Sequence, residues 1–171
     1  SAGHNKADIL SNGKKNVRES LINISRIKKT KLFYNDRDLY MDILIHEINR
    51  DRSYAERHGM EFSVRLNGTS DLSPEIMKKD GKNILEIFPD VQFYDYTKVY
   101  NRTKLMKFYP NYDITFSYDG YNWDQCEQFL NDGGKVAVVF DSETMPKTYK
   151  GYKVIDANGY DMRYLDPKGC I

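Results

Sequence analysis

The sequence has few cysteines, no long apolar run and no excess of charge of either sign. Its two cysteines, Cys126 and Cys170, lie far apart without CxxC spacing, which argues against a disulfide scaffold and against a thiolate zinc site. Both are therefore expected to be free thiols. No stretch approaches the roughly 18 apolar residues that cross a membrane, and the N-terminal residues lack the apolar core of a signal peptide. We therefore expect a cytoplasmic protein.

Several catalytic motifs are also missing. His46-Glu47 lies in a predicted helix, but the residue four positions after His46 is Arg50, so the HExxH zinc motif is absent. The sequence shows neither a phosphate-cradling glycine loop nor a Ser/His/Asp arrangement, and Gly133-Gly134 alone is weak evidence. No cofactor motif is evident, and Mg²⁺ is the metal that the carboxylates discussed below could bind.

The length of the chain fits one globular domain. With 171 residues, of which 40% are hydrophobic and 30% charged, a single core can bury roughly 70% of the unfolded surface. We assign residues 1–15 to a disordered or tag-derived N-terminus and residues 16–171 to a single α/β domain.

Alternating polar and apolar residues predict four strands, at residues 60–67, 88–98, 112–117 and 135–141. Helical patterns lie at residues 16–27, 36–57, 73–87 and 120–130, with Asn35-Asp36 as an N-cap and His58-Gly59 as a stop. Strands that alternate with helices about every 25 residues are typical of βαβ units and a parallel sheet. The fourth strand is almost wholly apolar, which predicts a central or deeply buried position.

Three of these strands have a polar face. The interpretation we favour is a mostly parallel, curved sheet resembling a partial barrel, with helices on its apolar face and its polar face toward solvent or a ligand. The alternative is an antiparallel sheet with one face exposed to solvent. Asn158-Gly159 further predicts a C-terminal β-hairpin of strands 152–156 and 160–165. Such a hairpin would gather one ion-pair cluster, structural or catalytic, from Asp156, Asp161, Arg163 and Asp166.

The strand at residues 88–98 is the most informative, because its side chains alternate between two faces. Gln92, Tyr94, Tyr96 and Lys98 share the polar face, opposite Val91, Phe93, Asp95 and Thr97. Functional residues of parallel sheets collect at the carboxyl ends of strands. The candidate catalytic residues are therefore Arg65, Asn67, Asp71, Tyr94, Tyr96, Lys98, Ser117 and Asp141.

These candidates suit phosphodiester chemistry or nucleic-acid binding. Arg and Lys could hold a phosphate, tyrosines could stack on a base or donate protons, and carboxylates could bind Mg²⁺ or act as general bases. In the alternative interpretation, Arg65 and Asp71 form a buried ion pair and the tyrosines fill the interior.

A basic stretch precedes the first strand. Between Lys14 and Lys31 the only acidic residue is Glu19, against seven basic ones. This stretch is either a solvated arm or a surface that attracts phosphates. The candidate nucleic-acid-binding residues are Lys14, Lys15, Arg18, Arg26, Lys28, Lys29 and Lys31.

From about residue 16 to 170, the sequence resembles the phage gene product 88 domain family. The resemblance is carried by an ordered series of segments: Arg65-x-Asn67 with Ser70-Asp71, Phe93-Tyr94-x-Tyr96-Thr97-Lys98 after Pro89, Asn111-Tyr112 leading to Ser117, the run from Val136 to Phe140, and Gly151-x-x-Val154-Ile155-Asp156 with Asp161-x-Arg163-x-x-Asp166. A cysteine-bearing N-terminal segment of that family has no counterpart here, so chemistry attached to those cysteines is not implied. The resemblance implies a partial barrel of βα units and a protein of phages and other mobile elements.

Two functions from different classes follow. The first is a counter-defence protein, such as an inhibitor of a Cas9-type CRISPR complex, that engages a nucleic-acid-guided complex or its guide RNA in the host cell. The second is a nuclease or other phosphodiester-acting enzyme with its site at the carboxyl ends of the strands. The two functions can coexist if the protein trims a guide RNA. A sugar or nucleotide enzyme of barrel type is a third interpretation.

Overall fold

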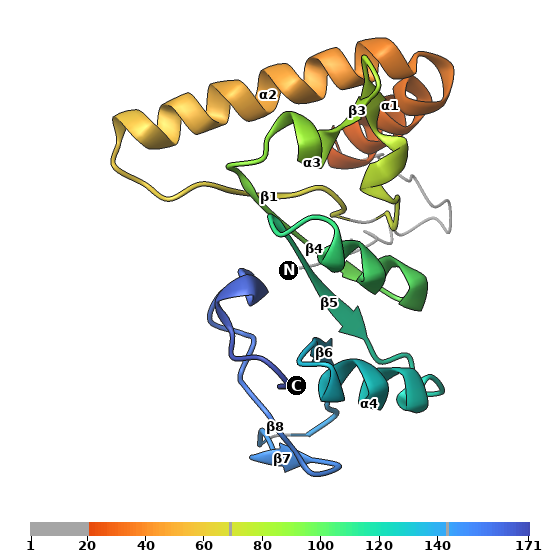
Figure 1. Ribbon diagram of the computed structural model, residues 1–171, viewed down its shortest axis with the longest axis vertical. Coiled ribbons are helices and arrows are strands. Elements are labelled where there is room, and N and C mark those ends of the chain that lie inside the picture. Colours follow the sequence, from red (N-terminus) through yellow and green to blue (C-terminus); the bar gives the residue numbers. More distant parts are fainter. Residues whose placement is uncertain (1–20, 69, 143) are drawn as a thin grey trace, which may run out of the picture. The chain divides into compact units, whose positions relative to one another are not determined.

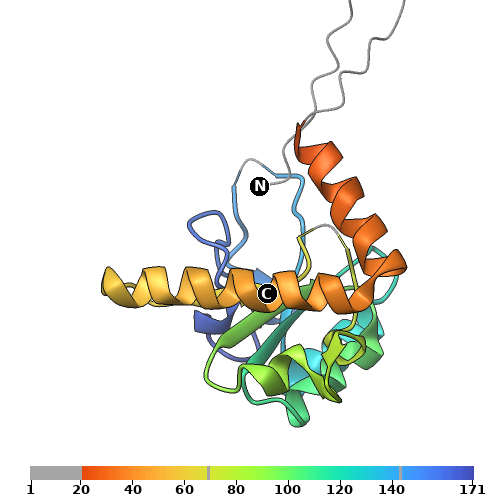
Figure 2. The same ribbon diagram turned by 90° about the horizontal axis from the view of Figure 1, so that it is seen from above.

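The computed structural model describes residues 21–68, 70–142 and 144–171. The chain divides into two compact units, residues 1–42 and 43–171. The first contains α1 (Leu21–Asn35) and the start of α2 (Arg37–Arg57), and Figure 2 shows α2 as one unbroken helix. The predicted cap and stop of α2 are confirmed: Asp36 Oδ1 accepts the Leu39 N–H at 3.0 Å, and Gly59 follows the helix with a φ of 64°.

The second unit is built on a four-stranded parallel sheet of β1 (Ser63–Arg65), β4 (Gln92–Thr97), β5 (Tyr112–Ser117) and β6 (Lys135–Ala137), in the order β1-β4-β5-β6 (Figure 1). The predicted α/β class is confirmed, with its N-terminal helices and a C-terminal antiparallel strand pair. The antiparallel alternative for the main sheet is wrong. Across the described residues the sheet is open and forms no closed barrel.

The predicted helix at residues 73–87 is replaced by shorter elements. The 3₁₀ helix η1 (Pro74–Ile76) leads into an antiparallel pair, β2 (Lys78–Lys79) and β3 (Lys82–Asn83), and then into α3 (Ile84–Ile87). The reason is local: Asp80 and Gly81 both have positive φ, of 51° and 80°, which suits a two-residue hairpin turn and breaks a helix. Asn83 and Glu86 form a capping box at the start of α3.

The two faces of the sheet have different coverings. Phe93, Tyr112, Ile114 and Phe116 are buried on one face, toward η2 (Tyr100–Lys107) and α4 (Trp123–Asn131). The C-terminal segment, residues 154–171, covers the other face, which carries the polar residues. Figure 1 shows this segment on the opposite side of β4 and β5 from α4. The predicted alternation along β4 is confirmed, with Phe93, Asp95 and Thr97 buried and Gln92, Tyr94 and Tyr96 half-buried.

Of the two positions predicted for the fourth strand, the central one is wrong, whereas burial holds for Lys135 and Val136. β6 ends at Ala137 and lies at the end of the strand order, and Val139 is 94% exposed. Val136, Val138 and Phe140 instead line a cavity, which explains an apolar run without a central position. On its outer side β6 meets the C-terminus, because the Val136 N–H donates to the Cys170 carbonyl at 3.0 Å.

The predicted position of the C-terminal hairpin is also wrong. The hairpin joins β7 (Thr148–Tyr149) to β8 (Tyr152–Lys153) through Lys150 and Gly151, which both have positive φ. Asn158-Gly159 lies in irregular chain before the 3₁₀ helix η3 (Arg163–Leu165). The Ile155 N–H donates to the Ile171 carbonyl at 2.7 Å, so this backbone pairs with the C-terminus rather than with residues 160–165.

Gly134 is the glycine that packing requires. A Cβ at Gly134 would lie 2.5 Å from the ring of Phe129, whereas a Cβ at Gly159 would meet nothing within 4 Å. Gly134→Ala is expected to lower the free energy of unfolding by about 1–3 kcal/mol through overpacking. Urea denaturation should show this loss for Gly134→Ala and little change for Gly159→Ala. Equal effects would contradict the packing argument.

Both cysteines are free, as predicted, and both are buried; burial raises the pKa of Cys126 to about 11. Among the helices that the structure describes, none combines the length and apolar character needed to cross a bilayer.

Candidate functional site

An acid network, with Asp95 buried and Asp71 partly exposed, lies at the carboxyl ends of β1 and β4. It consists of two aspartates and the residues that contact them. The aspartates are Asp71 and Asp95, and the residues in contact are Asn67, Thr97, Arg102 and Tyr112. Asp95 is 1% exposed and accepts the backbone and side-chain N–H groups of Asn67 at 2.9 and 2.8 Å. The Tyr112 hydroxyl donates to Asp95 Oδ2 at 3.1 Å. Burial raises the pKa of Asp95, and these donors oppose that rise.

Arg102 joins the two carboxylates of this network. Its guanidinium bonds Asp71, lies 3.5 Å from Asp95 Oδ2 and donates to the Tyr112 hydroxyl at 2.5 Å. Asp71 also accepts the Thr97 hydroxyl at 2.8 Å. The sequence-based alternative of an Arg65–Asp71 ion pair is therefore wrong. Asn67 and Asp71, two of the predicted catalytic residues, are held in position by these bonds.

Asp95, Thr97, Arg102 and Tyr112 are members of the network that were not among the predicted site residues. Asp95 was assigned correctly to the inward face of β4, with Phe93, but not to the candidate site. The available signal was an aspartate among buried side chains, because a carboxylate there needs hydrogen-bond donors or a cation.

Arg65, Tyr94 and Tyr96 come together on the polar face of the sheet. The Arg65 guanidinium lies 4.7 Å from the centre of the Tyr96 ring, and Tyr94 packs against Tyr164 with ring centres 5.6 Å apart. Asp161 bonds both Arg65 Nη1, at 2.7 Å, and the Tyr96 hydroxyl, at 2.9 Å. Burial makes the largest contribution to the raised pKa of Tyr96, and the hydrogen bond to Asp161 makes the next largest. Tyr96 is therefore a protonated hydrogen-bond donor at neutral pH.

The predicted hairpin cluster is divided between separate partners. Asp161 pairs with Arg65, whereas Arg163 pairs with Asp166 at 3.1 Å. Asp156 makes neither contact, and its Oδ1 accepts the Asn158 N–H at 2.9 Å. The prediction holds for the Arg163–Asp166 ion pair and is wrong for Asp156 and Asp161, because the hairpin that would have gathered all four residues is misplaced.

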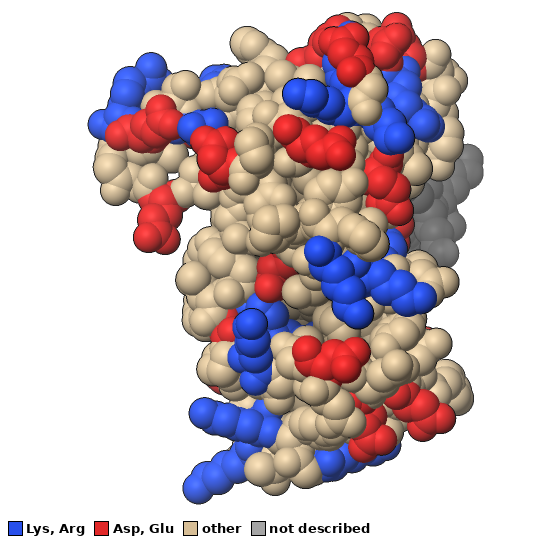
Figure 3. Space-filling view, in the orientation of Figure 1, with Lys and Arg blue, Asp and Glu red and all other residues tan. Residues whose placement is uncertain are grey.

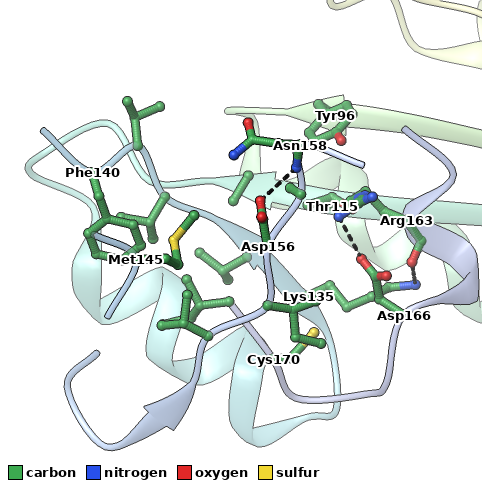
Figure 4. Close-up of a pocket in the computed structure, with 18 of the residues that line it drawn as sticks. Tyr96, Thr115, Lys135, Phe140, Met145, Asp156, Asn158, Arg163, Asp166 and Cys170 are labelled. Carbon is green, nitrogen blue, oxygen red and sulfur yellow. Dashed lines mark hydrogen bonds and ion pairs between the residues drawn. The ribbon is translucent and has the colours of Figure 1, made fainter. Parts of the chain in front are cut away.

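A cavity of about 550 Å³ lies between the polar face of the sheet and the C-terminal segment (Figure 4). Tyr96, Thr115 and Lys135 are neighbours in register across β4, β5 and β6, and all three line it. Asp156, Asn158, Arg163 and Asp166 line it from the C-terminal segment. This volume is typical of small-molecule sites, which are mostly apolar with a few polar groups.

The cations of the cavity already have partners. Lys135 Nζ donates to Asp113 Oδ2 at 2.8 Å and to the Arg163 carbonyl at 2.7 Å. Asp166, the partner of Arg163, also accepts the Tyr160 hydroxyl at 2.6 Å. Thr115 and Arg163 both line this cavity, and their buried atoms Thr115 Oγ1 and Arg163 Nε have no hydrogen-bond partner among the described residues.

The remaining predicted residues are dispersed. Lys98 is exposed, and its backbone N–H donates to Asp71 Oδ2 at 3.2 Å. Ser117 is half-buried at the end of β5. Asp141 is exposed and follows the cavity residue Phe140. The described part of the chain contains no group of three His, Cys, Asp or Glu side chains placed to hold a metal ion, and the Mg²⁺ site stays a prediction. Of the basic stretch, Arg26, Lys28, Lys29 and Lys31 are exposed on α1, whereas Lys14, Lys15 and Arg18 lie outside the described residues.

The family described as Gene product 88 matches residues 11–171. No curated protein and no solved structure matches the chain.

Proposed function

Since the chain belongs to the gene product 88 family of phage proteins, we propose that it is a counter-defence protein that inhibits a nucleic-acid-guided nuclease of the Cas9 type in the host cell. In this proposal α1 contacts the guide RNA of the complex. A phage benefits from blocking the nuclease that recognises its DNA, and a small protein without a cofactor motif can do so by binding alone.

The observation that carries the proposal is the charge of α1. Its 15 residues include four cationic side chains and no acidic one, and all four are exposed: Arg26, Lys28, Lys29 and Lys31. The whole chain has a net charge of only +1, and the face in Figure 3 shows cationic and acidic side chains interspersed. A cationic helix on a nearly neutral protein favours contact with phosphates at that helix.

The first test is the salt dependence of guide RNA binding. Changing Lys28, Lys29 and Lys31 to Glu should weaken binding and reduce the log–log salt slope by about 2, since each contact to a single strand contributes about 0.7. A matched control changes the exposed Lys78, Lys82 and Lys107 to Glu, which gives the same net charge. Equal slopes for the two variants would show that α1 makes no specific contact.

The second test is inhibition itself. The wild-type protein should lower DNA cleavage by the guided nuclease, and the α1 variant should restore it. Cleavage that continues unchanged with every effector of the host would overturn the proposal.

One observation favours the phosphodiester-acting alternative. The exposed Lys98 follows β4, and its backbone N–H donates to Asp71, whose side chain is 34% exposed. An ammonium group and a carboxylate at the carboxyl ends of parallel strands suit phosphate binding and proton transfer. Guide RNA incubated with the protein, with Mg²⁺ or with EDTA, should be shortened if this enzyme activity exists. Intact RNA under both conditions would leave binding as the mechanism.

A further inference from the structure

The cavity between the sheet and the C-terminal segment has an apolar part and a polar part. Figure 4 shows Phe140 and Met145 together at one end, and Thr115, Arg163 and Asp166 toward the other, with Asp156 between them. Val138, Val154 and Ile155 add to the apolar lining. A ligand that fills this space therefore combines an apolar face with polar groups at one end.

The polar end contains buried groups that still need partners. Thr115 is 3% exposed and Arg163 is 5% exposed, and within the described chain neither Thr115 Oγ1 nor Arg163 Nε has a hydrogen-bond partner. Buried polar atoms of native proteins are almost always hydrogen-bonded. Both residues line the cavity, so its polar end contains a hydroxyl and a guanidinium N–H that form no hydrogen bond within the described chain.

The charge of the cavity argues against a phosphate at this end. Lys135 is paired with Asp113, and Arg163 with Asp166. Asp156 is the remaining carboxylate of the cavity. It accepts one hydrogen bond, from the Asn158 N–H, and forms no ion pair in the described part of the chain. The group with free hydrogen-bonding capacity is therefore the Asp156 carboxylate, which can accept bonds from hydroxyl groups. The other groups of the cavity residues that are unpaired among the described residues are one hydroxyl and one N–H donor.

We infer that this cavity binds a ribonucleoside unit, with the base in the apolar part and the ribose hydroxyls on Asp156. A carboxylate is suited to accept hydrogen bonds from ribose hydroxyls, as acidic residues of dinucleotide-binding folds do. Phe140 and Met145 offer the apolar surface that a base requires. The unit comes from a free nucleoside or from the 3′-terminal nucleotide of an RNA strand, which also has both hydroxyls free. The inference does not depend on α1.

The test is calorimetric titration of the full chain with two series of ligands. One contains the four ribonucleosides and their 2′,3′-dideoxy forms, and the other a short single-stranded RNA ending in a ribonucleotide or in a dideoxynucleotide. Binding of the ribose forms with at least about tenfold loss for the dideoxy forms is expected, the loss typical of a hydrogen bond to a charged group. The series that binds identifies the source. Binding of neither, or equal binding of ribose and dideoxy forms, would overturn the inference.

Two variants place the binding in this cavity. Asp156→Asn should weaken binding at least about tenfold, because the hydroxyls lose a charged acceptor. Thr115→Val should also weaken binding while leaving the melting temperature unchanged or raised, because the hydroxyl it removes has no partner among the described residues. The control is Asp132→Asn, an exposed aspartate outside the cavity, which should bind as the wild type does. Wild-type affinity in both cavity variants would refute the assignment.

The same titrations separate this inference from the proposed function. The variant with Lys28, Lys29 and Lys31 changed to Glu should bind free ribonucleosides with wild-type affinity, even if it has lost guide RNA binding. A loss of nucleoside binding in that variant would contradict the placement in the cavity.

Discussion

Arg102→Met is expected to lower the free energy of unfolding by about 3–5 kcal/mol at pH 7. Arg102 is 5% exposed and is the cation that bonds Asp71 and approaches Asp95. Methionine fills a similar volume, so the main change is a buried carboxylate without its counter-ion. Removing one partner of a buried ion pair is much more harmful than removing both. Urea denaturation of the two proteins measures the difference.

The loss should depend on pH. Burial already raises the pKa of Asp95 above that of the unfolded chain, and removal of Arg102 should raise it further. A carboxyl group with a raised pKa in the folded state destabilises the protein as pH rises from the unfolded value through the folded value. The difference between Arg102→Met and the wild type should therefore be largest at pH 7 and shrink toward the ordinary aspartate pKa of about 3.9.

Two further variants identify the cause. Adding Asp95→Asn to Arg102→Met should recover part of the lost stability, because the uncompensated charge is removed. Arg50→Met breaks an ion pair with Asp51 in which both side chains are more than half exposed, and it should change stability little. A loss in Arg102→Met that is constant with pH and not recovered by Asp95→Asn would indicate lost packing instead.

Phe93→Ala is expected to lower the free energy of unfolding by about 3–5 kcal/mol, because it leaves a cavity in the core. Phe93 is fully buried in β4, between Val64 of β1 and Tyr112 of β5 in register. On the opposite face of β4, Tyr96→Phe removes one hydroxyl bond to Asp161 and should cost only about 1 kcal/mol, because this carboxylate is half exposed and water can replace the lost donor. The exposed Lys98→Ala should change stability still less.

Stability and function should therefore separate along one strand. Phe93→Ala should shift the urea midpoint strongly, whereas Tyr96→Phe and Lys98→Ala should leave it nearly unchanged. If the polar face takes part in RNA binding or cleavage, the last two variants should lose that activity while they stay folded. If the urea midpoint of Tyr96→Phe or Lys98→Ala were as low as that of Phe93→Ala, this face would be a structural network.

Asp95 illustrates how far the sequence could predict the site. The period of two along β4 placed it correctly beside Phe93 on the inward face, because strand geometry fixes the side of each residue. Its role could not be read from that pattern, since its donors come from Asn67, Arg102 and Tyr112 on other elements. The cavity was likewise not predicted, because it is formed where the C-terminal segment crosses Thr115 and Lys135.

The sequence by itself determined the four strands of the parallel sheet, their order along the chain and the two faces of β4, because these features follow from local periodicity and steric preference. Only the tertiary structure decided the partner of each charge. Asp71 pairs with Arg102, 31 positions away, and Arg65 pairs with Asp161, 96 positions away. Such pairs depend on the paths of the loops and of the C-terminal segment, and on the need of buried charges for counter-ions, which no local pattern encodes.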